Sequence, residues 1–343
     1  MKERTSPLHF GIVGATGLVG REVLKLLEER NFPIKSLSLF ASQRSRGEKL
    51  SFRGRFHEVE PLSYSSFDRP LDCLIFSAGA DVSREFAPMA MRCGIVVIDN
   101  SSTFRMSKEV DLVVPEVNGE LLSKGKPEQG RVIANPNCST IQLVMILKPL
   151  MKYGLKRVIV STYQAVSGAG LEAKEELKTY SLLWLSDERT NRKSSVFAHP
   201  IAFSCLPHID RFEENLYTFE EMKVIHETRK ILSSPHLAIT CTAVRVPVFD
   251  SHSESVNIEF EDDFDVEILK KDLESFKGVC VLDNPSNNVY PLNNNASGRD
   301  EVFVGRIRRD ESVKSGLNVW VVSDNIRKGA ALNAIQIAEK VFL

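Results

Sequence analysis

The sequence predicts an α/β fold in two parts: a doubly wound N-terminal domain on a parallel sheet, followed by an α+β domain. The first observation is a short apolar strand at 8–13 that runs into closely spaced glycines and then an amphipathic helix. The second is a pair of apolar runs, 72–76 and 95–99, typical of buried parallel strands. The third is the length of 343 residues, which suits about two domains.

The composition is that of a globular protein and excludes several classes of function. Hydrophobic residues make up 43% of the chain, the net charge is −1 and basic residues are scattered, so we expect no nucleic-acid partner. We expect no signal peptide and no membrane span, because the N-terminus is polar and no apolar run is long enough.

The six cysteines lack CxxC pairs and metal-ligand spacing. We therefore expect no bound metal, and mostly buried cysteines in a reducing cytoplasm.

Closely spaced glycines follow the first strand. Gly14, Gly17 and Gly20 form a G-x-x-G-x-x-G pattern ahead of the helix. Strand, glycine turn and helix are typical of Rossmann-like domains, in which a pyrophosphate rests on N–H groups at the helix start. Because the usual spacing is G-x-G-x-x-G, a tight turn without a ligand is the alternative.

The next expected strand, 37–41, indicates which dinucleotide is bound. An NAD site commonly has an acidic residue near the end of this strand, which holds the ribose hydroxyls. Here Ser42, Arg44 and Ser45 follow instead. A cation flanked by hydroxyls suits a 2′-phosphate, so we expect NADP. The alternative is a polar loop with a solvated arginine.

Small polar residues also follow the two buried strands, at the positions where such sheets bind ligands. The run 77–79 follows the first strand, and Asn100 follows the second. Arg105 lies just beyond and is a candidate for holding an anion; the alternative is a surface salt bridge.

Cys138 lies at the expected start of a helix, because apolar residues at helical spacing occupy 141–147. A helix N-terminus carries partial positive charge and unpaired N–H groups. It therefore favours a thiolate and can hold an oxyanion formed by its attack. From this segment alone, a reactive nucleophile and a buried structural cysteine are equally expected.

Polar residues near expected strand ends are further candidates in the second domain. Gln164 lies in the extended run 157–166, where it orients a carbonyl or a water, or is an edge-strand side chain. Arg245 lies in a strand-like run, and a turn at 250–251 can bring His252 back to its side. An ordinary histidine titrates in the range that proton transfer needs; the alternative is a hydrogen-bonded structural histidine.

Thr218 and Glu221 form a capping box, which predicts the start of a helix. Glu220, Lys223 and Glu227 share one stripe of that helix. Spacing alone favours a solvated charged face over a functional one.

The end of the chain completes the expected organisation. The segment 284–297 is rich in Asn and Pro, which predicts a long exposed loop, and an alanine-rich helix with a buried stripe closes the chain. We expect an N-terminal domain at 1–137, a second domain at 138–323, and a C-terminal helix at 324–343 that returns to the first domain.

Together these motifs resemble one family, the aspartate-β-semialdehyde dehydrogenases, in their compact branch. The resemblance covers nearly the whole chain, although no single motif is specific. The motifs are Gly14 to Gly20, Ser42 to Ser45, Asp99 to Ser102, Asn135 to Thr140, Glu220 with Lys223, Arg245 with His252, and Asp324 to Ala331.

The resemblance implies NADPH-dependent reductive dephosphorylation of β-aspartyl phosphate to L-aspartate 4-semialdehyde. This step belongs to the biosynthesis of lysine and diaminopimelate, methionine and threonine. The resemblance further implies that Cys138 expels phosphate and carries the aspartyl group as a thioester, with Gln164 beside it. NADPH supplies hydride, and His252 acts as acid/base as the aldehyde leaves.

The resemblance also divides the charged residues between the two ends of the substrate. It assigns Arg105 and Lys223 to the phosphate, and Arg245 and Glu220 to the amino-acid end. This division makes physical sense, because a zwitterion needs one cation and one anion, and arginine can bind a carboxylate bidentately.

The residues expected to bind NADP combine this resemblance with the turns and strand ends described above. They are Gly14, Thr16, Gly17, Leu18, Val19, Ser42, Arg44, Ser45, Ser77, Ala78, Gly79, Asn100, Ser167, Gly168 and Asn325. The resemblance also implies a catalytic second domain that forms a homodimer, with a dimer of dimers as the larger alternative.

Two places depart from the family pattern. Ser251 precedes His252 where glycine is more usual, which puts the aim of the imidazole in question. Leu292, Asn293 and Asn294 replace a more proline-rich stretch, which bears on the conformation of that loop.

Two other functions fit parts of the pattern. An N-acetyl-γ-glutamyl-phosphate reductase uses the same thioester chemistry, but that family has glycine where Asn137 stands, and Glu220 suits a free amino group. The second of these functions is NADP binding without catalysis, as in a non-catalytic relative of the family. Against it, the reactive residues are all present: Cys138, Gln164, Arg245 and His252.

Overall fold

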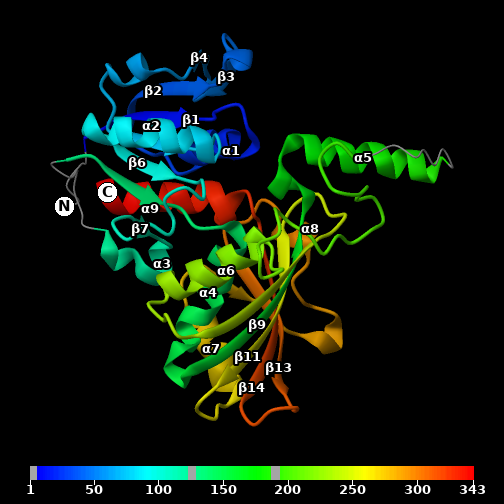
Figure 1. Ribbon diagram of the computed structural model, residues 1–343. Coiled ribbons are helices and arrows are strands. Elements are labelled where there is room, and N and C mark those ends of the chain that lie inside the picture. Colours follow the sequence, from blue (N-terminus) through cyan, green and yellow to red (C-terminus); the bar gives the residue numbers. More distant parts are fainter. Residues whose placement is uncertain (1–5, 123–128, 187–193) are drawn as a thin grey trace. The chain divides into compact units, whose positions relative to one another are not determined.

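The structure is a computed structural model that describes residues 6–122, 129–186 and 194–343. The chain divides into two compact units (Figure 1). Unit 1 comprises Met1–Asn137 with Ala330–Leu343, and unit 2 comprises Cys138–Gly329. Within the described ranges, no helix is both long and apolar enough to cross a membrane.

Unit 1 is built on an eight-stranded sheet with the order β3-β4-β2-β1-β5-β6-β8-β7. Every neighbouring pair is parallel except β3 with β4, and the chain runs outward from β1 in both directions. This arrangement confirms the doubly wound sheet predicted from the sequence. The strands are β1 (Leu8–Val13), β2 (Ile34–Ala41), β3 (Lys49–Phe52), β4 (Arg55–Pro61), β5 (Cys73–Phe76), β6 (Val96–Asp99), β7 (Asp111–Leu112) and β8 (Arg131–Ala134).

Helices cover both faces of this sheet, which is why its central strands β1, β5 and β6 are largely apolar. Alternate residues of β5 lie in different cores: Ile75 packs with side chains of α1 and α9, and Phe76 packs with side chains of α2. The C-terminal helix α9 contacts α1, α3 and β6 (Figure 1). The helices are α1 (Leu18–Glu29), α2 (Ala80–Arg92), α3 (Pro115–Asn118) and α9 (Leu332–Phe342).

Unit 2 contains a mixed six-stranded sheet with the order β10-β9-β11-β14-β13-β12. The pairs β9–β10 and β12–β13 are parallel, and the other neighbours are antiparallel. This is the α+β arrangement expected for the second part of the chain. The strands are β9 (Leu155–Gln164), β10 (Ala238–Arg245), β11 (His252–Phe260), β12 (Val279–Val281), β13 (Val302–Asp310) and β14 (Gly316–Ser323).

Helices α4, α6 and α7 pack on this sheet, and α4 also contacts both of the other two (Figure 1). Helix α4 is mostly apolar, and ten of its thirteen residues are buried, so packing on most of its surface fixes its position. The helices of unit 2 are α4 (Cys138–Leu150), α5 (Leu171–Leu185), α6 (Phe219–Ile231), α7 (Val266–Ser275) and α8 (Asn293–Ala296).

Two expectations about the chain need correction. The segment 284–297 is not a featureless loop, because it contains a 3₁₀ turn, the short helix α8 and a backbone bridge between Asn284 and Val289. The cysteines are not mostly buried either: Cys73 and Cys241 are buried, but Cys93 and Cys205 are exposed. Cysteine spacing alone does not report which side chains the fold covers.

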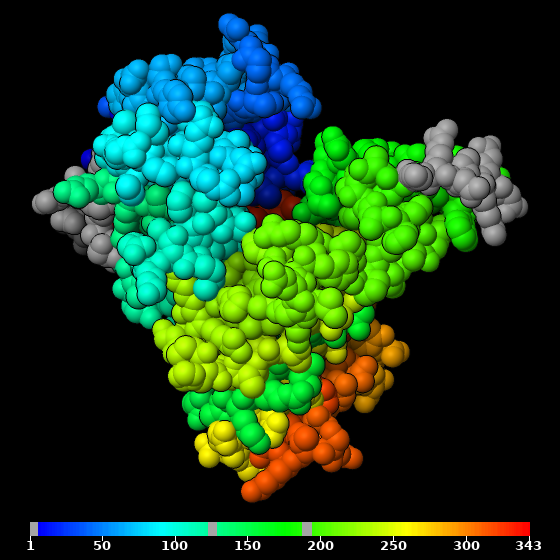
Figure 2. Space-filling view, viewed as in Figure 1, coloured from blue at the N-terminus to red at the C-terminus, as the bar shows by residue number. Residues whose placement is uncertain are grey.

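One part of unit 2 exposes several large apolar side chains. They belong to α5 and to the chain that follows it, within residues 171–216 (green in Figure 2). The exposed residues are Leu171, Leu182, Trp184, Leu185, Phe203, Phe212 and Leu216. Among them, the rings of Trp184 and Phe203 lie against each other, with centroids 5.7 Å apart, and exposed apolar side chains that gather in this way are typical of a protein contact.

Candidate active site

Polar side chains lie side by side where four neighbouring strands of the unit 2 sheet begin or end. The strands are β10, β9, β11 and β14. Arg245 at the end of β10 pairs with Gln164 at the end of β9, and the register of β11 places His252 opposite Gln164. His252 also pairs with Ser323 at the end of β14. Because laterally paired residues point to the same face, all four side chains lie in one row. Each is buried, and His252 has no exposed surface.

Cys138 is the first residue of α4, as its sequence context predicted. Its side chain is partly exposed, whereas the helix beyond it is buried. Gly329 packs closely against it, because a Cβ atom at position 329 would lie 2.9 Å from the Cβ of Cys138. A partly accessible thiol at a helix N-terminus is the setting in which cysteines are reactive.

Arg245 lies within electrostatic reach of this thiol. Burial lowers the pKa of Arg245, and the negative charges of Glu220 and Cys138 oppose that change. Nη1 of Arg245 donates to the Ala165 carbonyl at 2.8 Å, which fixes one side of the guanidinium. The cation therefore favours a negative charge on the sulfur of Cys138.

His252 has a defined tautomer. The Ala165 N–H donates to Nδ1 of His252 at 3.0 Å, so the neutral ring carries its proton on Nε2. Burial lowers the pKa of His252 to about 3, and the charge of Arg245 adds to this effect, while Glu220 and the Ser251 backbone oppose it. Burial thus moves His252 out of the titration range expected of an ordinary histidine.

Gly168 separates Arg245 from His252 and leaves space between them. A Cβ at position 168 would lie 2.9 Å from Nη1 of Arg245 and 3.3 Å from Nε2 of His252. Both side chains therefore face the same small volume, and the turn at 250–251 does bring them to one side. Gly168, expected at the cofactor, lies beside the catalytic candidates.

The charged stripe of α6 is buried, which overturns the solvated face that spacing favoured. Glu220 is 5% exposed and Glu227 is 1% exposed. Glu220 accepts a hydrogen bond from Nε2 of Gln164 at 3.1 Å and pairs with Nζ of Lys223 at 2.7 Å. Lys223 also pairs with Asp210 at 3.1 Å. The capping box forms as predicted between Thr218 and Glu221.

Ser167 and Asn325 meet each other in unit 2. Nδ2 of Asn325 donates to the Ser167 hydroxyl at 3.1 Å, and Oδ1 of Asn325 accepts from the Ser251 N–H at 3.0 Å. Two residues expected at the cofactor are therefore linked to the residue that precedes His252.

Most of the other residues expected to bind the cofactor lie in unit 1, around its first glycine turn. Gly14 has a φ of +85°, and a Cβ there would lie 2.4 Å from the Ser77 carbonyl oxygen, so the turn fits closely against 77–79. The Thr16 and Ser45 hydroxyls lie 3.2 Å apart, which joins this turn to the 3₁₀ turn Gln43–Ser45. Arg44 is exposed beside it.

Asn100 gives an independent sign that unit 1 holds a ligand. Its side-chain oxygen and nitrogen are both buried, and neither has a hydrogen-bond partner among the described residues. Buried polar groups in proteins are nearly always paired, so a polar ligand beside β6 fits this amide. Helix α1 begins at Leu18, next to Val19, and offers its first N–H groups to an anion.

Arg105 also lies in unit 1. It is 7% exposed, and its Nη2 donates to the Asn100 carbonyl at 2.7 Å. The burial excludes the surface salt bridge that the sequence allowed as an alternative.

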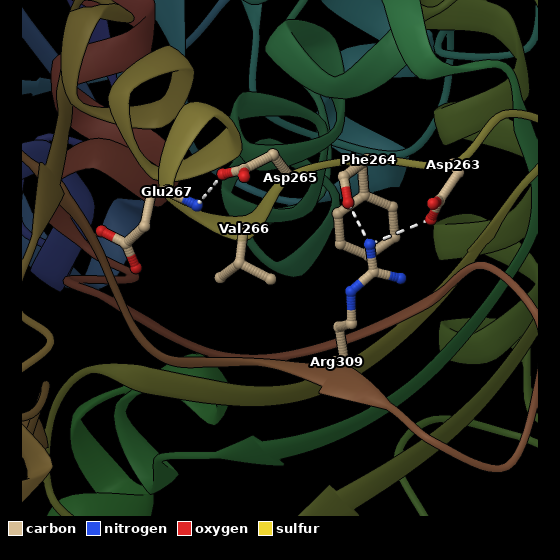
Figure 3. Close-up of a pocket in the computed structure, with 6 residues that line it drawn as sticks. All are labelled: Asp263, Phe264, Asp265, Val266, Glu267 and Arg309. Carbon is tan, nitrogen blue, oxygen red and sulfur yellow. Dashed lines mark hydrogen bonds and ion pairs between the residues drawn. The ribbon is translucent and has the colours of Figure 1, made fainter.

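A separate surface pocket on unit 2 contains none of the expected site residues (Figure 3). Asp265 there accepts from the first N–H groups of α7, and Arg309 pairs with Asp263 at 2.9 Å and lies over the Phe264 ring. These groups satisfy one another and hold the local chain. Within the described residues, no group of three His, Cys, Asp or Glu side chains could hold a metal ion.

Sequence reasoning missed two contributors to the site. The Ala165 N–H has no side-chain signature, and Asp210 lies in a stretch without a recognisable pattern. No motif pointed to either.

Comparison with known proteins identifies the family. The family description "Semialdehyde dehydrogenase, NAD binding domain" matches residues 9–125, and "Semialdehyde dehydrogenase, dimerisation domain" matches residues 147–328. Aspartate-semialdehyde dehydrogenase of Aquifex aeolicus is 53% identical over 96% of this chain and 97% of its own length. A relative at this identity and coverage shows membership of the family.

Solved structures agree with this result. Aspartate semialdehyde dehydrogenase II of Vibrio cholerae, complexed with ASA, has a TM-score of 0.91 and 41% identity and covers 98% of both chains. The Candida albicans enzyme with NADP has a TM-score of 0.77 and 26% identity, again covering 98% of both chains. These relatives do not favour the N-acetyl-γ-glutamyl-phosphate reductase alternative. The chain therefore belongs to the aspartate-semialdehyde dehydrogenase family of phosphorylating aldehyde dehydrogenases, oxidoreductases of amino-acid biosynthesis.

Proposed function

We propose that this chain reduces β-aspartyl phosphate to L-aspartate 4-semialdehyde through a thioester on Cys138, with NADPH as reductant. One observation carries the proposal: a partly exposed thiol at the start of α4 lies within reach of Arg245, which shares a small space with His252. In the biosynthesis of lysine and diaminopimelate, methionine and threonine, this reaction is the reductive step after aspartate phosphorylation.

The buried charges suit the amino-acid end of the substrate. Arg245 is a cation with a planar fork of donors, of which Nη1 donates to the Ala165 carbonyl. Glu220 is a buried anion oriented by Gln164 and Lys223. We assign the substrate carboxylate to Arg245 and its ammonium group to Glu220, and we assign the phosphate to Arg105 and Lys223.

The acyl-transfer step uses the thiolate of Cys138. The sulfur attacks the acyl carbon, a C–S bond forms, the bond from carbon to phosphate oxygen breaks, and phosphate leaves. Negative charge develops on the carbonyl oxygen during the attack. The first N–H groups of α4 and the Gln164 amide are the donors that we assign to it.

Reduction of the thioester completes the reaction. NADPH, when bound, supplies the hydride. The tetrahedral alkoxide on Cys138 then collapses to the aldehyde and expels the thiolate, so no net proton transfer is needed. We assign Nε2–H of His252 as the donor that stabilises this alkoxide, because Nδ1 is occupied and the ring is neutral. This role differs from the acid/base role that the family resemblance implied.

The role of His252 predicts an unusual pH dependence. Since its pKa is held at about 3, His252 keeps one protonation state between about pH 5 and pH 8. His252→Gln is expected to lower kcat about 10²-fold and leave the shape of the pH profile of kcat/KM unchanged. An ionisation near the ordinary histidine value that is present in the parent enzyme and lost in the variant would contradict this assignment.

The cofactor we propose is NADP, and three features of unit 1 support it. Arg44 lies between Ser42 and Ser45 at the end of β2, Thr16 joins that turn to the glycine turn, and the Asn100 amide is buried without a partner among the described residues. The remaining residues that we assign to the cofactor belong to both units. They are Gly14, Gly17, Leu18, Val19, Ser77, Ala78 and Gly79 of unit 1, and Ser167, Gly168 and Asn325 of unit 2.

An assay in the reverse direction tests the proposed function. Purified protein is mixed with phosphate, NADP or NAD, and either L-aspartate 4-semialdehyde or N-acetyl-L-glutamate 5-semialdehyde. We expect turnover of the first aldehyde only, with kcat/KM at least about tenfold higher for NADP because Arg44 pairs with the 2′-phosphate. Turnover of only the acetylated aldehyde would overturn the proposal. Cofactor binding without turnover of either would indicate a non-catalytic relative.

We further propose a homodimer formed by unit 2, with a dimer of dimers as the larger alternative. The dimerisation-domain match covers 147–328, and the exposed apolar side chains of 171–216 fit a protein contact. Sedimentation velocity distinguishes the two assemblies from a monomer.

We also propose a cytoplasmic location. The described cysteines are free thiols, and the proposed reaction needs Cys138 in its reduced form, which a reducing compartment maintains.

A further inference from the structure

The residue before His252 has a strained backbone. Nine non-glycine residues of the described chain have φ in the left-handed region, and Ser251 is one of them, with a φ of 69°. The other eight are exposed, whereas Ser251 has no exposed surface. Its hydroxyl is also buried and has no hydrogen-bond partner among the described residues. Something other than the Ser251 side chain must therefore hold this conformation.

Two side-chain amides hold the backbone of Ser251 from opposite sides. Oδ1 of Asn325 accepts from the Ser251 N–H at 3.0 Å. Nδ2 of Asn293 donates to the Ser251 carbonyl at 2.7 Å. Both backbone groups of the strained residue are thus fixed by hydrogen bonds from elsewhere in unit 2.

The Asn293 amide also reaches the residue after His252. Its Oδ1 accepts from the Ser253 hydroxyl at 3.2 Å. One planar amide therefore binds both chain neighbours of His252, through the carbonyl of Ser251 and the hydroxyl of Ser253. Because a carbonyl accepts and a hydroxyl can donate, this pattern fits only one orientation of the amide.

The segment around Asn293 is held in place by hydrogen bonds and packing on both sides, so it can fix the position of the Asn293 amide. Nε1 of Trp320 donates to the Pro291 carbonyl at 3.2 Å. Ala296 is buried in a small apolar cluster with Phe303 and Val322. The Gly298 N–H donates to Asp324 at 2.7 Å. Asn293 is thus held on both sides in sequence while its amide holds Ser251.

We propose that Asn293 is a positioning residue that aims the His252 imidazole by holding the strained Ser251. The inference rests on the proposed function, in which Nε2 of His252 donates to the substrate oxygen. The two places where this chain departs from the family pattern, Ser251 and the stretch with Asn293, are therefore in direct contact. Serine in place of glycine raises the cost of a left-handed backbone, and the Asn293 amide offsets that cost.

The first test compares Asn293→Ala with Asn294→Ala. Asn294 is an exposed neighbour on the same short helix and makes no side-chain hydrogen bond within the described chain. Asn293→Ala is expected to lower kcat about tenfold and change KM less than about twofold, because the amide touches no substrate but fixes the direction of the imidazole. Asn294→Ala should leave both constants within about twofold. Equal effects of the two substitutions would overturn the proposal.

Asn293→Asp keeps the acceptor for Ser253 and removes the donor to Ser251. It should lose kcat as Asn293→Ala does, and it serves as the second variant if the alanine variant folds poorly. Retention of full kcat by the aspartate variant would show that the bond to the Ser251 carbonyl has no role in positioning.

A double-mutant cycle with Ser251→Gly tests whether the two positions act together. Glycine adopts the left-handed backbone without strain, so the amide should matter less in its presence. The loss on Asn293→Ala is expected to fall from about tenfold in the parent protein to about twofold or less in the Ser251→Gly background. The same loss in both backgrounds would contradict the coupling.

A measurement independent of turnover separates this proposal from the proposed function. Protein labelled with ¹⁵N-histidine, with His252 assigned by His252→Gln, is expected to show a single Nε2–H tautomer that is lost in Asn293→Ala and kept in Asn294→Ala. If the parent protein turns over neither aldehyde but shows this pattern, the proposed function fails and the positioning stands. If turnover is present and the Asn293→Ala spectrum is unchanged, the positioning fails and the function stands.

Discussion

Cys138→Ala is expected to lower kcat by about 10⁴-fold or more in both directions, because the proposed acyl group is carried on its sulfur. The structure places this thiol at the start of α4, with Arg245 in electrostatic reach and Gly329 packed behind it. Removal of the sulfur ends acyl transfer but leaves unit 1 intact. Cofactor affinity, measured by fluorescence titration, should therefore stay within about twofold of the parent value.

The matched control is Cys205→Ala. Cys205 is an exposed cysteine of unit 2 outside the row of site residues, so its loss should leave kcat unchanged. Full turnover by the Cys138 variant would overturn the assigned nucleophile. Loss of turnover in both variants would point to a general effect of thiol removal instead.

Arg245 carries the second large effect. Replacing it with methionine is expected to lower kcat/KM about 10³-fold, because a buried cation that we assign to the substrate carboxylate and that favours the thiolate is lost. Arg245→Lys keeps the charge but removes the planar fork, so a smaller loss of about 10²-fold is expected, mostly in KM. Steady-state kinetics with varied aldehyde separate the two variants.

Arg299→Lys is the control for the arginine series. This guanidinium is exposed on unit 2 and pairs with Glu301 at the surface, so its replacement should leave kcat/KM within about twofold. If Arg245→Lys also retains the parental KM, Arg245 does not bind the substrate carboxylate.

The sequence predicted those parts of the molecule that depend on local patterns. The central parallel strands β5 and β6 of unit 1 are almost wholly apolar runs, and burial on both faces of the sheet explains them. The start of α4 at Cys138 and the capping box of α6 follow from residues within a few positions of each helix end. Local chemistry decides these features, so a single sequence carries them.

Features that depend on distant contacts were not predictable in the same way. Periodicity placed Glu220 and Glu227 on one stripe of a helix, but it could not say that the stripe is buried or that Gln164 meets Glu220. The protonation state of His252 depends on burial and on the backbone N–H of Ala165, the residue after β9. Asn293 reaches Ser251 across 42 residues. Tertiary packing, which single-residue patterns do not encode, sets all of these.

The most direct test of the central claim is a single-turnover experiment without cofactor. The protein is mixed with β-aspartyl phosphate, and released phosphate is measured together with the intact mass and peptide map of the quenched protein. We predict a phosphate burst stoichiometric with subunits and an aspartyl adduct on the peptide that contains Cys138, with neither in Cys138→Ala. Phosphate release without an adduct, or an adduct on another residue, would contradict a thioester on Cys138.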